Sequence, residues 1–287
     1  MADLEPHPTV TVGRRSILRR LVRHRASYLG LAIIAGYLFL ATVGPLLVGA
    51  DPRQGEITER LAPPSAAHWL GTDELGRDVW SRLVHGARVS LQIQVVGVLV
   101  AMVPGVLWGL VSGYVGGWVD AVSMRLLDIL LAFPSILLAI AIVAVLGPSF
   151  ANVIIAVGIS SIPRFARLVR GVVLELRERD FVLAARAVGE RPAAIIGRYL
   201  APGTITAITV EATIRMATLL LVAAGLNFLG LGVQPPTPEW GAMLANARDY
   251  MFVAPHVTIA PGIAITIVVI GFNLVGDALR DAVDPRT

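Results

Sequence analysis

The sequence predicts an all-α integral membrane protein in which six helices cross the bilayer and both chain termini face the cytosol. Hydrophobic residues make up 55% of the 287 residues and charged residues only 15%, whereas soluble domains average about 25% charged residues. Six apolar runs recur along the chain, and a helix of about 20 residues crosses the roughly 30 Å hydrocarbon core of a bilayer. Arginines gather beside particular runs, which indicates the orientation.

The composition excludes several kinds of chemistry. All 24 basic residues are arginine, so the chain lacks the lysine that a phosphate-binding P-loop or a Schiff-base enzyme requires. It has no cysteine, which excludes disulfides, thiolate zinc sites and iron–sulfur clusters. We therefore expect no catalytic residue, metal site or cofactor in this chain. The net charge of +4 comes from arginines that flank apolar runs, a pattern of membrane topology and not of nucleic-acid binding.

The chain begins with a basic, cytosolic N-terminus at residues 1–27, and a first transmembrane helix is expected at residues 28–50. Arg14 and Arg15 faintly resemble a twin-arginine export signal. The apolar run that follows them is long enough to cross a bilayer, and no small-residue cleavage site is clear. We therefore expect an uncleaved first span.

Residues 51–88 form a polar external segment that ends in an interfacial helix. Thr72 or Asp73 can cap the start of this helix. Trp80 then lies at the depth of the lipid head groups, where aromatic residues are enriched. This helix is expected to lead into the second span.

Residues 89–280 are predicted to form a translocation core of five transmembrane helices. The spans are expected at residues 89–112, 122–146, 150–170, 204–230 and 257–277. Proline and glycine inside these runs are tolerated in a bilayer bundle, because neighbouring helices satisfy the freed backbone groups. Asp128 is expected to pair with Arg125 near the cytosolic end of the third span. A cytosolic tail at residues 281–287 ends the chain.

Positive charge assigns the connecting segments to the two sides of the membrane. Residues 164–203 carry eight arginines, whereas the loop at residues 231–256 carries only Arg248. The segment at residues 51–88 has five arginines, but its six acidic residues outnumber them. Because cytosolic loops carry the excess of arginine, we expect the N-terminus and the 164–203 segment to lie inside.

A loop at residues 164–202 shows apolar and charged residues alternating at helical spacing. An alanine-rich stretch ends at Gly189, Pro192 can begin a second short helix, and Pro202 is expected to stop that helix before the fifth span. One interpretation is a solvated basic linker. We favour the other, a helix–glycine–helix that a cytosolic partner grips, because Phe181 and its apolar neighbours would otherwise face water.

Four polar residues lie inside the predicted fifth and sixth spans. Glu211 and Arg215 are four residues apart and are expected to pair, since each lone charge costs about 2.5–3.5 kcal/mol on insertion scales. Two interpretations stay open for them, a structural ion pair and a contact with cargo in the translocation path. The same two interpretations apply to Asn227 and Asn273.

The stretch Ala184-Ala185-x-x-x-Gly189, followed at the matching distance by Pro202, resembles the EAA loop of binding-protein-dependent ABC importer permeases. In that family the loop forms a coupling helix seated in a cleft of the ATPase subunit. The resemblance implies a role in ATPase coupling for Leu183, Ala184, Ala185, Gly189, Arg191 and Pro202. The sequence departs from the family pattern at three positions, which are Leu183, Tyr199 and Ala201.

Further motifs are similar to the C-type subunit of the dipeptide/oligopeptide/nickel permease subfamily. They occupy residues 68–78 with 86–91, 124–134, 228–241 and 276–286. They follow one another in the order of that subfamily, although Asn227 stands where a serine is expected. The resemblance covers nearly the whole chain beyond about residue 15.

This resemblance implies a type I ABC importer (MetI-like) permease fold in a prokaryotic cytoplasmic membrane. The implied partners are a homologous B-type permease in a heterodimer, one or two cytosolic ABC ATPase subunits carrying ATP and Mg, an external solute-binding protein and membrane lipid. The implied cargo is a di- or oligopeptide, with nickel or another small solute as the alternative. A secondary transporter is a less favoured alternative, because its expected inverted repeats are not seen.

Overall fold

A computed structural model describes residues 25–283 of the chain. Its helices are α2 (Arg25–Thr42), α3 (Gly44–Leu47), α4 (Val79–Val115), α5 (Gly117–Leu131), α6 (Ser135–Leu146), α7 (Phe150–Leu176), α8 (Asp180–Ala187), α9 (Pro192–Ile195), α10 (Ala201–Phe228), α11 (Trp240–Ala247) and α12 (Pro255–Val283). Three single turns complete them, namely η1 (Ile57–Glu59), η2 (Ile196–Leu200, a π-helical turn) and η3 (Arg248–Tyr250). Within residues 25–283 the only β-pairing consists of two isolated bridges. The all-α prediction is confirmed, whereas most of the predicted N-terminal segment 1–27 and tail 281–287 lie outside the described residues.

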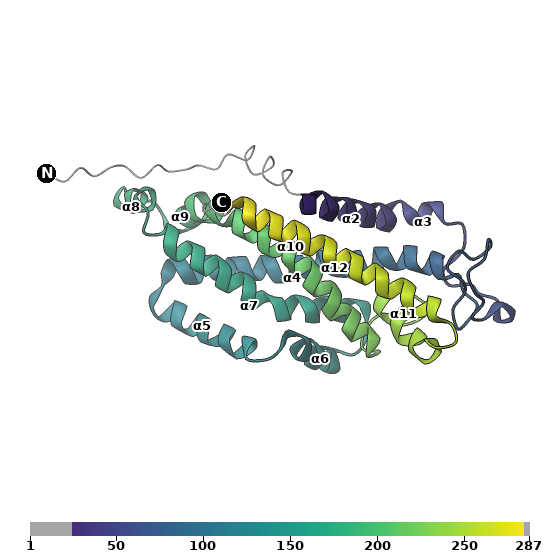
Figure 1. Ribbon diagram of the computed structural model, residues 1–287. Helices are drawn as coiled ribbons and strands as arrows, with labels where there is room; N and C mark the ends of the chain where they lie inside the picture. The colour runs from purple at the N-terminus through teal and green to yellow at the C-terminus, as the bar shows by residue number, and fades with distance from the viewer. Residues whose placement is uncertain (1–24, 284–287) are drawn as a thin grey trace.

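The long helices α4, α7, α10 and α12 run side by side and form the bundle (Figure 1). α4 packs along α7 over most of its length, and α12 packs against α10 and α2. Small residues allow the first of these contacts: a Cβ added at Gly109 would lie 2.5 Å from the carbonyl oxygen of Ala166. Close backbone approach at glycine is how helices pack in lipid, where the hydrophobic effect does not drive their association.

Among residues 25–283, four helical stretches are long and apolar enough to cross a membrane. They are Val79–Val115, Phe150–Leu176, Pro192–Phe228 and Pro255–Ala282. The predicted third span is a bent pair instead of a straight helix, because α5 and α6 meet at 88°. Pro134 explains the break, since proline disfavours a helical conformation in the residue before it and donates no backbone hydrogen bond. With α2 as a shorter apolar helix, the number of six crossings stays a prediction.

The start of α4 differs from the expected one. The predicted interfacial helix and second span form one helix of 37 residues, about 55 Å long at 1.5 Å per residue. Asp78 caps it by accepting a hydrogen bond from the Ser81 backbone N–H at 2.6 Å. The expectation that Thr72 or Asp73 caps this helix was wrong, because both fold the preceding turns instead.

Two boundaries around the predicted 164–202 loop also shift. α7 continues to Leu176, so Arg164, Arg167 and Arg170 lie on this long helix and not in a loop. Pro202 does not end a helix but lies in the first turn of α10. In the π turn before it, the Ala201 N–H donates to the Ile196 carbonyl five residues back. This wider hydrogen-bond spacing lets the helix continue although Pro202 has no N–H to donate.

The two ends of the bundle carry different structures. α8, α9 and the end of α12 lie at one end, whereas α3, the 51–78 segment and α11 lie at the other (Figure 1). We call these the knob end and the outer end, the second after the external position that the sequence predicts for residues 51–88. The arrangement places the candidate sites at opposite ends of the long helices.

Candidate functional site

At the knob end, α8 and α9 are joined by a tight glycine turn, and we call residues 180–195 the knob. The Glu190 N–H donates to the Ala185 carbonyl and the Gly189 N–H donates to the Arg186 carbonyl, each at 3.0 Å. Gly189 has φ +77°, a left-handed conformation that glycine adopts without strain. This is the Schellman pattern of helix termination. The predicted helix–glycine–helix is therefore present, with Pro192 in the first turn of α9.

One face of the knob is anchored to the bundle. Val182, Ile195 and Leu200 are fully or almost fully buried and pack in one apolar cluster with Val169 and other residues of α4 and α7. Ala185 belongs to the same cluster and is 6% exposed. Ala185 thus packs on the buried side of the knob.

The opposite face of the knob carries apolar side chains on its surface. Val188 is 82% exposed, Leu183 is 43% exposed, and Ala184 is exposed beside them. Phe181 is half exposed, with its ring centroid 6.3 Å from that of Tyr199. Val188 was not among the predicted coupling residues, although an apolar residue directly before a turn glycine is a signal in the sequence that points to it.

The six predicted coupling residues are thus divided by the structure. Leu183, Ala184 and Arg191 are exposed on the knob, Gly189 forms its turn, and Ala185 anchors it. Pro202 is exposed on α10, beyond the π turn. The geometry brings the first five together and leaves the sixth on the neighbouring helix.

Polar contacts fasten the knob end of α7 to α4 and α5. Arg170 donates two hydrogen bonds to the Asp120 carboxylate, each at 2.5 Å, and Ser112 donates a third to the same group. The Arg177 guanidinium donates to the Gly113 carbonyl at 2.9 Å. Bidentate arginine–carboxylate pairs combine charge with fixed geometry. These bonds hold the knob end of α7 against α4 and α5.

A set of charged side chains lies along α5, α7 and α10 between the two ends. Glu211 and Arg215 pair at 2.6 Å with both side chains largely buried, which confirms the predicted ion pair. Asp128 pairs with Arg167 of α7 at 2.5 Å. The prediction that Asp128 pairs with Arg125 was wrong, because a residue of α7 approaches Asp128 across the helix–helix contact. Sequence spacing within α5 does not reveal such a contact.

The two asparagines do not join this charged set. Asn227 is buried at the outer end of α10, where its side-chain amide donates to the Ala223 carbonyl and its side-chain oxygen accepts from the Val233 N–H. These bonds fasten the turn that follows α10. Asn273 is exposed on α12. The structure therefore supports a structural role for Asn227 and separates all four predicted polar residues into three places.

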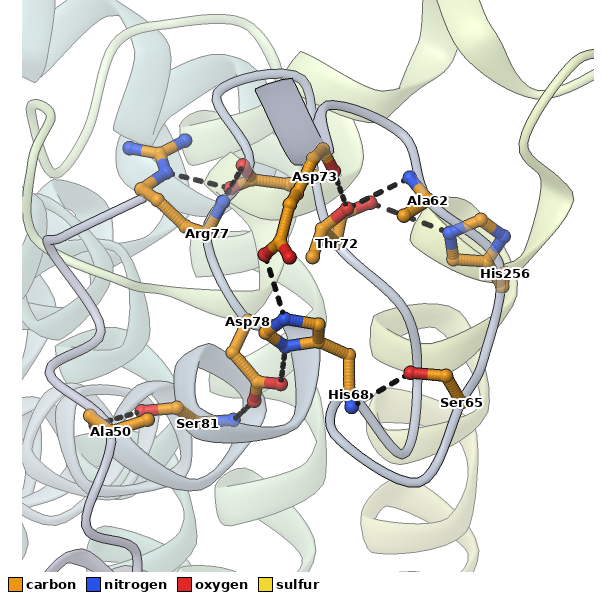
Figure 2. Close-up of polar contacts among 11 residues, drawn as sticks. Ala50, Ala62, Ser65, His68, Thr72, Asp73, Arg77, Asp78, Ser81 and His256 are labelled. Atoms are coloured by element: carbon orange, nitrogen blue, oxygen red, sulfur yellow. Dashed lines mark hydrogen bonds and ion pairs between the residues drawn. The ribbon is translucent and has the colours of Figure 1, made fainter. Parts of the chain in front are cut away.

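At the outer end, the 51–78 segment is folded by polar contacts (Figure 2). The Asp73 carboxylate accepts hydrogen bonds from the backbone N–H groups of Leu75 and Arg77 and pairs with the Arg77 guanidinium at 2.7 Å. Arg82 of α4 reaches the same carboxylate at 3.2 Å. Asp73 thus joins the segment to α4.

His68 connects two acidic residues in this segment. Its Nδ1 lies 2.8 Å from Asp78 and its Nε2 lies 3.0 Å from Glu59 (Figure 2). The hydrogen bond with Asp78 is the main reason that the pKa of the His68 imidazole lies above its ordinary value. Burial opposes this rise, and the hydrogen bond with Glu59 adds to it. Because Asp78 also caps α4, the charge of His68 influences both the loop and the helix start.

The short helix α11 is docked into the outer end by Glu239 and Trp240. The fully buried Glu239 carboxylate caps α11 by accepting from the Ala242 N–H at 2.9 Å, and it accepts a second bond from the Ser90 hydroxyl. Burial raises the pKa of Glu239 to about 7. The Trp240 indole donates to the Leu83 carbonyl at 2.9 Å. Ser90 and Leu83 belong to α4, so α11 is held against that helix.

No group of three or more potential metal-ligating side chains occurs within residues 25–283. Most of the charged groups described above pair with one another or accept hydrogen bonds from backbone N–H groups in turns. The arrangement offers one exposed apolar knob at one end, a charged face between the helices, and a polar, folded segment at the other end.

Comparison with known proteins shows which protein family shares this sequence and fold. Residues 105–287 match the family described as "Binding-protein-dependent transport system inner membrane component". Residues 14–64 match the "N-terminal TM domain of oligopeptide transport permease C". Both matches agree with the motifs that the sequence carries.

Relatives of known name are similar over most of the chain. The dipeptide transport system permease protein DppC of Alkalihalophilus pseudofirmus is 46% identical over 95% of this chain and 90% of its own length. The glutathione transport system permease protein GsiD of Pectobacterium atrosepticum is 52% identical over 78% of this chain and 74% of its own length. The protein of the same name from Escherichia coli O1:K1 / APEC is 54% identical over the same shares.

The fold itself is similar to that of a solved transporter. A chain of the MetNI methionine ABC transporter in an inward-facing conformation superposes with a TM-score of 0.57 at 20% sequence identity, over 71% of this chain and 97% of that chain. The predicted MetI-like fold is thereby confirmed. This chain therefore belongs to the family of binding-protein-dependent transport system inner membrane components, and within it to the peptide permease subfamily.

Proposed function

We propose that this chain is a membrane-spanning subunit of an ATP-driven peptide importer and that the knob at residues 180–195 couples it to a separate ATPase. The observation that carries the proposal is the knob itself. It exposes Val188 and Leu183 while the buried side of α8 anchors it to α4 and α7. An exposed apolar surface on a rigid support is typical of a protein–protein contact.

The mechanism follows from how the knob is connected. ATP and Mg²⁺ bind to the partner ATPase, whose closure displaces the knob. The bonds from Arg170 to Asp120 and from Arg177 to Gly113 pass this movement to α4, α5 and α7. The translocation path between the permease subunits then opens to the other side of the membrane. The ATPase drives this change because it binds one conformation better than the other.

The proposed cargo is a di- or oligopeptide. It rests on the relatives, one named a dipeptide permease and two named glutathione permeases, since glutathione is itself a small peptide. An external solute-binding protein delivers this cargo at the outer end, where the 51–78 segment and α11 lie. The chain itself performs no chemistry on the cargo.

A second permease subunit completes the path. In the stretch Pro192–Phe228, the rest of this chain buries only 17% of the most apolar segment, compared with 61% in Phe150–Leu176. The open face of α10 fits a homologous B-type subunit in a heterodimer. The complex lies in a prokaryotic cytoplasmic membrane with the N-terminus and the knob inside, as the arginine distribution predicts.

Reconstitution tests the proposed function. Liposomes containing this chain, its partner permease and ATPase should accumulate a peptide only when the binding protein is outside and ATP is inside. Uptake driven by a proton or sodium gradient in the absence of ATP would contradict the proposal and support a secondary transporter. ATP-dependent uptake of nickel or another small solute, with no peptide uptake, would retain the coupling mechanism and reject the cargo.

The coupling surface has its own test in Val188→Asp. A carboxylate on this exposed side chain should reduce ATP-dependent uptake and ATPase co-purification at least tenfold, because a charge is costly to bury in an apolar contact. The thermal stability should be unchanged, since Val188 is 82% exposed. Val253→Asp at the outer end is the matched control, because Val253 is 79% exposed and out of reach of a cytosolic ATPase. Full ATPase binding by V188D would remove the knob from the mechanism.

A further inference from the structure

The ion pairs among α5, α7 and α10 leave two arginines of these helices, Arg125 and Arg164, outside any pair within residues 25–283. Asp128 pairs with Arg167, and Glu211 pairs with Arg215. Arg164, one turn before Arg167 on α7, interacts electrostatically with Glu211 and Arg215. Among residues 25–283 it has no hydrogen bond or ion pair of its own. Around Glu211, two arginines, Arg164 and Arg215, therefore share one carboxylate.

Arg164 lies well inside the length of α7. It is about 21 Å from Phe150 and about 18 Å from Leu176 along the helix axis, at 1.5 Å per residue. Arg215 has a similar position on α10, about 21 Å from Ala201. The surplus charge therefore lies within the part of the bundle that crosses the membrane, and not at a helix end.

An arginine at this depth cannot face lipid tails without a large cost, and such residues mark substrate or ion pathways. The Arg164 side chain is exposed within this chain. Of the four long apolar stretches, the one that contains the neighbouring helix α10 has the smallest share of its apolar segment buried. Water in a translocation path therefore satisfies this guanidinium more readily than hydrocarbon does. The position indicates that α7 and α10 line that path.

We propose that Arg164 binds the carboxylate of the cargo as it passes through the membrane. The inference rests on the proposed peptide function and names the chemical group that the permease itself recognises. A guanidinium presents two parallel N–H donors that match the two oxygens of a carboxylate. Because Glu211 and Arg215 neutralise each other, the local surplus is one positive charge. One carboxylate balances this surplus, and nearby Glu211 and Asp128 oppose tight retention, which a transport path must avoid.

The test compares uptake of alanyl-alanine with uptake of its C-terminal amide. Both probes are added to liposomes that contain the complete complex with ATP inside and binding protein outside. The measured quantity is the ratio of the initial uptake rates, acid over amide. The binding protein is the same for every variant, so its own preference cancels when variants are compared. Arg164→Gln should lower this ratio about tenfold, the size expected for one lost charge-assisted hydrogen-bond pair.

Two further variants make the test specific. Arg164→Lys keeps the charge without the paired donors and should lower the ratio by a smaller factor. If R164Q fails to assemble, R164K decides: a reduced ratio supports the proposal and an unchanged ratio overturns it. Arg248→Gln removes an equal charge from an exposed side chain at the outer end and should leave the ratio unchanged.

The remaining outcomes separate this inference from the proposed function. An unchanged ratio in R164Q, with normal uptake, would overturn carboxylate recognition alone. An equal fall for both probes would overturn it as well and would assign Arg164 to the contact with the partner permease. If the wild-type complex took up neither probe, the proposed peptide function would fail, and this inference would fail with it.

Discussion

A single buried carboxylate, Glu239, holds α11 against the bundle through the Ala242 N–H and the Ser90 hydroxyl. Water cannot reach it, so the ionised form is disfavoured and the pKa rises to about 7. The folded protein therefore keeps a proton on Glu239 that the unfolded chain loses near its ordinary pKa of 4.5. Protonation and folding are linked at this residue.

The linkage has a definite sign. Between pH 4.5 and about 7 the folded state binds more protons than the unfolded state, so the contribution of Glu239 to stability falls as pH rises. The melting temperature of the purified wild-type protein should drop by a few degrees from pH 5 to pH 6.5. Glu239→Gln, which has no proton to lose, should remove most of this drop.

The control for this prediction is Glu178→Gln. Glu178 is exposed at the knob end and, within residues 25–283, pairs only with its neighbour Arg177, so its replacement should leave the pH slope unchanged. A slope in E239Q equal to that of the wild type would show that Glu239 does not carry the linkage.

Residues close together in sequence were the most predictable ones. The Glu211–Arg215 pair follows from a spacing of four residues, which places two side chains on one helix face, and the structure confirms it. The partner of Asp128 could not be predicted, because it comes from α7. Arg164 was assigned to a loop for a related reason: charge density alone does not show where an amphipathic helix ends.

At the scale of elements, apolar runs predicted the existence of the long helices better than their ends. α4 begins ten residues before the predicted second span at 89–112, because Asp78 caps a polar first turn that packs on the outer segment. Prolines were predicted only in part: the expected tolerance inside a span holds at Pro104, whereas the bend at Pro134 and the continuous helix at Pro202 were not predicted. Pro104 lies inside α4 without ending it, Pro134 precedes an 88° bend, and the π turn carries the chain past Pro202. Neighbouring helices decide which prolines break a helix.

The outer segment is the element with a built-in response to pH. The raised pKa of His68 means that the folded state keeps its proton above the ordinary value of 6.5. The contribution of His68 to stability is thus complete below pH 6.5 and is lost as pH rises through its raised value. Its bonds to Asp78 and Glu59 then weaken, and the segment should open more often.

Trypsin cleavage measures this opening, because Arg53 and Arg60 are exposed in the segment. His68→Ala should be cleaved there several-fold faster than the wild type at pH 6, and the two rates should converge by pH 8.5. Using the ratio of the two rates removes the pH dependence of trypsin itself. His85→Ala, on the adjacent helix α4, should behave like the wild type. A ratio for H68A that does not change with pH would contradict the role of His68.

At the scale of the whole molecule, the fold separates two surfaces by the length of its helices. The knob lies at one end, and the 51–78 segment and α11 lie at the other (Figure 1). Family motifs and arginine counts predicted this division, and the comparisons confirm the family and the MetI-like fold. The division of the proposed coupling residues into anchoring Ala185 and exposed Leu183 and Val188 was not predictable, because the helical phase of α8 relative to α7 depends on tertiary packing.

The account depends on the knob facing the cytosol, and the absence of cysteine allows a clean test of this claim. Single-cysteine variants Val188→Cys and Ile57→Cys place a thiol on exposed side chains at opposite ends of the chain. A membrane-impermeant maleimide added to intact spheroplasts should label I57C and leave V188C unlabelled until the membrane is permeabilised. Labelling of V188C in intact spheroplasts, with protection of I57C, would put the knob outside and contradict the account.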